Sequence, residues 1–254
     1  MVELPTGIPA FVGYTKKAKR GAQALQNAPT RISSLAEYYS IFGAGPNTIV
    51  ESDKDIGALG FVSGSRFLMY FGMRLFFSNG GSTCWIISVG GYEDGPFSAF
   101  ALIDDLLMVL AGEPEPSIRL APDAAFLEID EWTKVANAYL DRCGKLMSRF
   151  AILDILGGGE VRNLDAKTDI ISDTETGFRS KIISKSNSYG LAYYPWVDTN
   201  VVDESAIGLG TVGPNLRKQL SQLIADEIDT DAKPHSPAEA RNKDIQALAQ
   251  AIDE

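Results

Sequence analysis

Histidine and cysteine are scarce in this sequence of 254 residues, which contains one histidine and two cysteines. A structural zinc site takes four ligands, mostly Cys and His, and His235 with the distant Cys84 and Cys143 is too small a set. A Ser-His-Asp or Cys-His catalytic site would require His235 inside a pocket. The polar, proline-flanked stretch Lys233–Pro237 instead predicts an exposed linker. Such sparse cysteines indicate a reducing compartment and thiols that pack as small apolar core residues.

Complete nucleotide-binding motifs are also missing. Gly157, Gly158 and Gly159 follow an apolar, strand-like run, but Glu160 comes next and no G-x-G-x-x-G or G-x-x-x-x-G-K-[ST] pattern is completed. A carboxylate at that position would repel phosphate, so these glycines are interpreted as a flexible loop that leaves a sheet. Asp154, just before them, resembles a Walker-B acid in position, but by itself it is better explained as a strand-end residue bonded to backbone amides.

The remaining candidate groups are acidic pairs and one aromatic run. Asp104–Asp105 and Asp53 with Asp55 fall on an expected helix face and in an expected loop, so they are interpreted as solvated carboxylates. Catalytic acid–base pairs need convergence in a cleft, which a sequence does not show. Tyr193–Trp196 is either a binding platform or, preferably, a packing element against a neighbouring segment or subunit. The sequence therefore predicts no catalytic, cofactor-binding or metal-binding residue, no cofactor and no enzymatic activity.

Long apolar runs and an excess of basic charge are absent as well. The net charge is −10, from 23 basic and 33 acidic residues, which argues against nucleic acid and anionic membranes as partners. A membrane-spanning helix needs about 20 apolar residues. The richest run, Phe67–Phe77, is shorter and includes Arg74, and Met1–Phe11 lacks the features of a secretory signal. We therefore expect that the protein is synthesised in the cytoplasm and does not insert into a membrane.

Short apolar runs bounded by glycine, proline and polar residues predict strands in five places. These are Gly7–Thr15, Thr83–Val89, Ser117–Ala121, Phe150–Leu156 and Tyr189–Tyr194. Ala44–Gly60 has no clear period and is expected to be loop.

Helical patterns lie between and after the strands. Ser34 and Glu37 form a capping box for a short helix that ends near Gly43. The clearest amphipathic stripe consists of Trp132, Val135, Ala136, Tyr139, Leu140 and Cys143, in a helix expected to end at Gly144. Further helices are expected at Ser65–Ser78, Ser98–Ala111, Asp169–Ile183, Pro214–Glu227 and Pro237–Ile252.

Because strands and helices alternate and the strands are almost continuously apolar, the sheet should be covered on both faces. The predicted fold class is α/β: a mixed, largely parallel sheet covered by helices on both faces, followed by C-terminal helices. The expected domains are an α/β core at residues 1–200 and a helical segment at residues 201–254.

The order of five segments resembles the sheath subunit of contractile phage tails and related bacterial injection systems. The resemblance covers roughly residues 4–200, and no single motif in it is chemically diagnostic. Its segments are Leu4–Ala18 (LPTGIPAFVGYTKKA), Pro29–Gly43 (PTRISSLAEYYSIFG), Met73–Gly90 (MRLFFSNGGSTCWIISVG), Cys143–Ile155 (CGKLMSRFAILDI) and Tyr189–Val197 (YGLAYYPWV).

The resemblance implies a structural protein that stacks around an inner tube and contracts to drive the tube through a target envelope. It implies as partners copies of the same chain, the tube protein, and baseplate and terminal cap proteins. It also implies synthesis in the bacterial cytoplasm and incorporation into a phage-tail-like particle that can be released from the cell. Members of the family usually have an extended N-terminal arm and a C-terminal domain beyond the YYPW-like region. Both are expected to be missing from this chain, which puts the contact with the tube in doubt.

Two other functions remain open from the residues alone. A nucleotide- or flavin-binding α/β enzyme would need a phosphate-cradling loop, and the glycine run completes none. Another self-assembling protein, such as a tail-tube or capsid-like module, would fit the missing active site. Tube proteins are typically small β-barrels, however, and the alternating α/β pattern argues against them.

Overall fold

The computed structural model describes residues 7–46, 49–52, 59–62, 67–94, 98–103, 110–163, 165, 167–174, 177–202, 208–228 and 234–253. The chain forms two compact units. Unit 1 comprises residues 1–46 and 66–201, and unit 2 comprises residues 47–65 and 202–254. Thus a segment from the first quarter of the sequence belongs to the same unit as the C-terminal helices.

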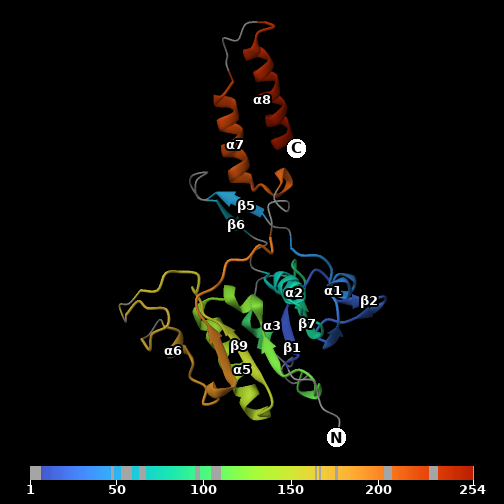
Figure 1. Cartoon of the computed structure of the whole chain (residues 1–254), viewed down its shortest axis with the longest axis vertical. Coiled ribbons are helices and arrows are strands. Elements are labelled where there is room, and N and C mark those ends of the chain that lie inside the picture. Colours follow the sequence, from blue (N-terminus) through green and yellow to red (C-terminus); the bar gives the residue numbers. More distant parts are fainter. Residues whose placement is uncertain are drawn as a thin grey trace. The chain divides into compact units, whose positions relative to one another are not determined.

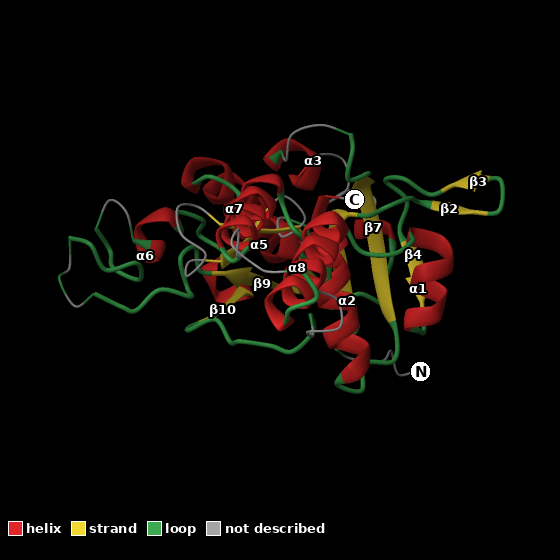
Figure 2. Ribbon diagram, turned by 90° about the horizontal axis from the view of Figure 1, so that it is seen from above, coloured by secondary structure: helices red, strands yellow, loops and turns green. Residues whose placement is uncertain are grey.

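Unit 1 is built on a six-stranded sheet, in which every neighbouring pair is parallel except β4 and β7. Figure 2 shows β10 and β4 toward opposite sides of this sheet. The mixed, largely parallel sheet predicted from the sequence is therefore confirmed. Across the sheet the order is β10 (Gly190–Tyr193), β9 (Phe150–Asp154), β8 (Ile118–Leu120), β1 (Pro9–Tyr14), β7 (Cys84–Gly90) and β4 (Thr30–Ile32).

Helices cover both faces, as the continuous burial of β1 and β7 requires. Alternate residues of β1 enter different hydrophobic clusters: Ala10 and Val12 enter one, and Phe11 enters the other. The first cluster includes residues of α3 (Ala99–Ile103) and α5 (Ile129–Leu146). The second includes residues of α1 (Leu35–Phe42) and α2 (Met69–Ser78). The two-residue period of the strand thus assigns one layer of helices to each face.

The predicted stripe of α5 is confirmed, because all six of its residues are buried. The predicted end at Gly144 is wrong, since the helix continues to Leu146 and Met147 follows in the left-handed conformation with φ 55°. The Met147 N–H donates to the Cys143 carbonyl at 2.8 Å. Gly144 has another role, because a Cβ there would overlap the Ser186 side chain. The glycine permits a close approach of two segments inside the fold rather than terminating the helix.

The start of α1 agrees with the predicted capping box in one half. The Ser34 hydroxyl accepts the Glu37 N–H at 3.1 Å, but the Glu37 carboxylate accepts the N–H of Ser33 (2.9 Å) instead of that of Ser34. Gly43 ends the helix with φ 86°, a conformation that favours glycine.

Unit 1 also contains several shorter elements. The basic segment after β1 forms a small hairpin, β2 (Lys19–Arg20) and β3 (Gln23–Ala24). The predicted helix at 98–111 is described only at its ends, as α3 and a 3-10 turn at Leu110–Gly112, and the start of the helix predicted at 65–78 also lies outside the described residues. A second 3-10 turn, Pro122–Phe126, follows β8.

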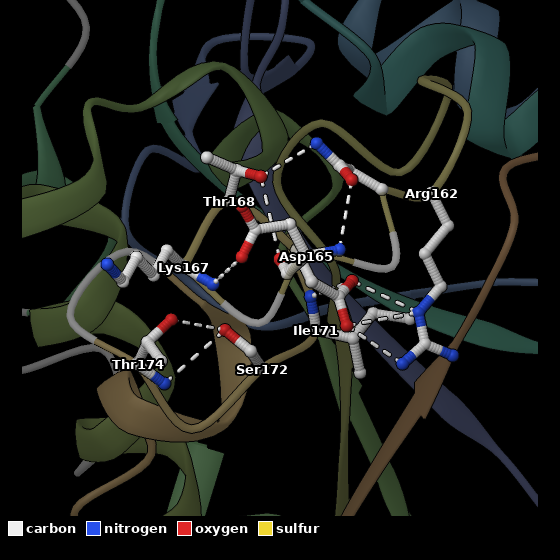
Figure 3. A network of polar contacts seen from close by, with 9 residues as sticks. Arg162, Asp165, Lys167, Thr168, Ile171, Ser172 and Thr174 are labelled. Atoms are coloured by element: carbon white, nitrogen blue, oxygen red, sulfur yellow. Dashed lines mark hydrogen bonds and ion pairs between the residues drawn. The ribbon is translucent and has the colours of Figure 1, made fainter.

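The helix predicted at Asp169–Ile183 is largely wrong, since α6 (Phe178–Lys181) is the only helical part among the residues described there. Side-chain bonds order the loop before it (Figure 3). The Arg162 guanidinium donates to both carboxylate oxygens of Asp169, which is 5% exposed, and these bonds lower the pKa of Asp169. Asp169 also accepts the N–H of Ile171, a local bond that competes with helix formation.

Unit 2 contains the two predicted C-terminal helices, α7 (Pro214–Asp226) and α8 (Pro237–Asp253), which lie side by side (Figure 1). Pro214 occupies the first turn of α7, as expected. The loop predicted at Ala44–Gly60 is partly wrong, because β5 (Ile49–Ser52) and β6 (Leu59–Val62) form an antiparallel hairpin. β5 contacts α7, more than 160 residues along the chain, and no local pattern encodes such a contact.

Candidate assembly surface

The described six-stranded sheet has two edge strands, β10 and β4, and β10 is the longer, with four residues against three. β10 pairs with β9 in parallel, from Gly190 opposite Ala151 to Tyr193 opposite Asp154, and no described strand pairs with its other side. The side chains of Leu191 and Tyr193 are 43% and 67% exposed. An open edge of this kind presents unpaired backbone N–H and C=O groups to an incoming strand.

Asn137 of α5 positions the chain that leads into this edge. Its Nδ2 donates to the Lys181 carbonyl at 2.8 Å, and its Oδ1 accepts the N–H groups of Ile183 (2.9 Å) and Ser184 (2.8 Å). One amide side chain therefore satisfies three backbone groups of the loop between α6 and β10. The edge strand is attached to the longest helix of the core through this loop.

An apolar groove of about 400 Å³ lies beside β10. Gly190 and Ala192 are small residues opposite Ala151 and Leu153, and a Cβ at Gly190 would overlap the Leu140 side chain. The groove is lined by Leu140, Leu153, Phe178, Arg179, Ile182, Asn187, Gly190, Leu191 and Ala192. This surface can therefore receive apolar side chains next to a strand edge that offers hydrogen bonds.

Two of the three glycines that resembled a phosphate loop, Gly158 and Gly159, have a packing role. The indole of Trp196 lies over Gly158 and Gly159, and a Cβ at Gly158 would come within 2.6 Å of it. The backbone N–H of Trp196 donates to the Gly158 carbonyl at 2.8 Å, and the Tyr194 hydroxyl donates to the Glu160 carbonyl at 2.9 Å. The aromatic residues after β10 thus pack against the loop after β9. This agrees with the preferred interpretation of Tyr193–Trp196 as a packing element.

Replacing Gly158 by alanine should therefore destabilise unit 1. The new methyl group would collide with the Trp196 ring and with the Ile155 carbonyl oxygen at 2.9 Å. Overpacking of this kind costs about 1–3 kcal/mol of unfolding free energy. Urea denaturation monitored by tryptophan fluorescence would measure it, with Gly112→Ala as control, since Gly112 is also in unit 1 and a Cβ there meets nothing within 4 Å. Equal stability of the two variants would contradict the packing role.

The other candidate residues that the structure describes do not come together in a site. His235 is exposed, as predicted for a linker, and Cys84 and Cys143 are buried free thiols. Burial raises the pKa of Cys84 to about 12, so this thiol is unreactive at neutral pH. Asp154 is exposed at the end of β9, partial desolvation raises the pKa of its carboxyl, and no described backbone amide donates to it, unlike the expected strand-end bonding. The acidic pairs at 53/55 and 104/105 lie outside the described residues.

Asp123 was not predicted from the sequence to have a role, although its carboxylate accepts several backbone N–H groups. It lies in the 3-10 turn after β8, is fully buried, and accepts the N–H of Tyr14 at 2.6 Å and that of Met69 at 2.9 Å. The Leu68 N–H also donates to it. A Cβ on Gly13 would come within 2.5 Å of its Oδ2. This carboxylate connects the end of β1 to the start of α2, and the only local signals were an unexplained glycine in a strand and an aspartate after proline.

No protein-family model and no curated protein matches this chain. Among the described residues, no group of three or more His, Cys, Asp or Glu side chains is arranged to hold a metal ion. None of the helices in the described ranges combines the length and hydropathy needed to cross a bilayer.

Proposed function

We propose that the chain is a structural subunit of a contractile sheath, which polymerises around an inner tube and drives it through a target envelope on contraction. The observation that carries the proposal is the open β10 edge beside its apolar groove. Strand addition at such an edge joins neighbouring copies through main-chain hydrogen bonds, and apolar pockets beside it select the side chains.

The segments that resemble sheath subunits support this proposal by their places in unit 1. They include the strands β1, β7, β9 and β10, the helix α1 and the second half of α2. The resemblance thus coincides with the sheet and its open edge rather than with unit 2. Head-to-tail contacts that do not close produce helical filaments, and repeated contacts with two alternative packings produce a cooperative transition such as contraction.

Cryo-electron microscopy of particles from producing cells tests this proposal. Wild-type chain should be found in a helical layer around an inner tube. Leu191→Lys with Tyr193→Lys places two charges on the exposed edge, which opposes strand addition, and should reduce incorporation at least tenfold. Val161→Lys is the matched control, since Val161 is 94% exposed and lies elsewhere.

Circular dichroism of the purified variants would verify that the fold is retained. Normal incorporation of the double variant would show that β10 is not the contact. A chain that never enters a particle, and that binds ATP, NAD or FMN stoichiometrically with a Kd below about 10 μM (roughly −7 kcal/mol), would favour the alternative of an α/β nucleotide- or flavin-binding enzyme.

A further inference from the structure

Arg119 is a buried cation without a hydrogen-bond partner. It occupies the centre of β8, between Ala10 of β1 and Ala151 of β9, and its exposed fraction is 0%. In the part of the chain that the structure describes, neither its Nε nor either terminal nitrogen has a hydrogen-bond partner. All of the guanidinium's donors are therefore without a partner in the apolar layer between the sheet and α5.

Two more arginines lie near this group. Arg149 precedes Ala151 by two residues, so it shares the α5-facing side of the sheet with Arg119. It is 4% exposed and donates to the carbonyls of Leu110 and Glu113. Arg142 extends from α5, and its buried Nε also lacks a partner among the described residues. The three side chains come from a strand, a helix and the segment before another strand.

The electrostatics indicate that the three guanidinium groups are close enough to repel one another. Burial and, to a smaller extent, the charges of Arg149 and Arg142 together lower the pKa of Arg119 to about 10. Burial likewise lowers the pKa of Arg149. An uncompensated buried charge is strongly unfavourable, and buried cations in proteins are normally paired. A negatively charged group between the three guanidinium groups would compensate their charges.

We propose that Arg119, Arg142 and Arg149 form a binding site for a small inorganic oxyanion of the phosphate or sulfate type. A tetrahedral oxyanion offers several acceptor oxygens to planar guanidinium forks, the pairing in which arginine is most effective. The complete burial of Arg119 limits the ligand to an ion small enough to be enclosed in the core. This site does not depend on the proposed sheath function, since none of its three arginines lines the groove beside β10.

The test measures thermal unfolding of the full chain in phosphate, sulfate and chloride at equal ionic strength. The wild-type Tm should rise by roughly 5–10 °C at an oxyanion concentration about a hundred times the Kd. Both oxyanions also stabilise proteins non-specifically, so the rise must exceed that of Arg119→Met. Arg20→Met, at an exposed arginine outside the groove, should respond like wild type. A larger response to phosphate than to sulfate, or the reverse, identifies the preferred ion.

Equal responses of wild type and Arg119→Met would overturn the proposal. If Arg119→Met does not fold, Arg119→Lys keeps the charge but loses the planar fork, and its response should fall by at least half. Phosphorus NMR of the wild-type protein with added phosphate provides a direct measurement. A phosphate signal that is neither broadened nor shifted by wild type at any concentration tested, together with an unchanged Tm, would also overturn it.

Discussion

Asp123→Ala is expected to lower the free energy of unfolding by about 3–5 kcal/mol. The substitution leaves the buried N–H groups of Tyr14, Leu68 and Met69 without their acceptor, and each unsatisfied buried donor costs about 1–3 kcal/mol. Asp94→Ala is the matched control, because Asp94 also accepts a backbone N–H but is exposed. Urea denaturation at pH 8 would measure both. A loss below about 1 kcal/mol for Asp123→Ala would refute the connecting role of this carboxylate.

The same carboxylate predicts how stability changes with pH. Burial raises the pKa of Asp123 from its ordinary 3.8 to about 7, against the opposing effect of its backbone hydrogen bonds. Between pH 4 and 7 the folded chain then retains a proton that the unfolded chain has released. Stability therefore falls as the pH rises through this window. Asp123→Asn should remove that part of the slope in denaturation series from pH 4 to 8, and an identical slope in both proteins would contradict it.

Trp132→Ala should cost about 3–5 kcal/mol of unfolding free energy. Trp132 is 2% exposed in the layer between α5 and the sheet, and its ring lies 5.4 Å from that of Phe178 in α6. Its loss would leave a large cavity and would also remove the contact that holds α6 beside the groove.

Lys134→Ala is the control for this helix, because Lys134 pairs only with Glu131 at the surface and should cost less than about 0.5 kcal/mol. Guanidinium denaturation monitored by circular dichroism would compare the two variants. Similar denaturation midpoints for the two variants would show that burial of the α5 stripe does not stabilise the core.

Much of the fold could be predicted from local patterns. The strands at 7–15 and 83–89 were correct because burial on both faces of the sheet makes β1 and β7 continuously apolar, and the stripe of α5 was correct because burial of one helix face imposes a helical period. β4 was missed because its alternation, with Thr30 and Ile32 buried and Arg31 exposed, extends over only three residues. Its position is set by pairing with β7, more than 50 residues further along the chain.

The candidate surface was harder to predict than the strands around it. The apolar run at Tyr189–Tyr194 indicated a strand, and the aromatic residues after it indicated packing. The groove, however, depends on contacts such as Asn137 with Ser184, 47 residues apart. The failed helix at 169–183 has a similar cause, because the Arg162–Asp169 pair stabilises a loop whose composition alone suited a helix.

The position of β1 between β7 and β8 has a mechanical consequence. All six residues of β1 are buried, and both neighbouring strands run parallel to it. A force directed along β1 would load the hydrogen bonds of both ladders at the same time, in shear, instead of opening them one after another. Unit 1 should therefore yield at a high force along this direction and at a much lower force when β10 is peeled from β9, so that the sheet resists extension more than it resists fraying at its edge.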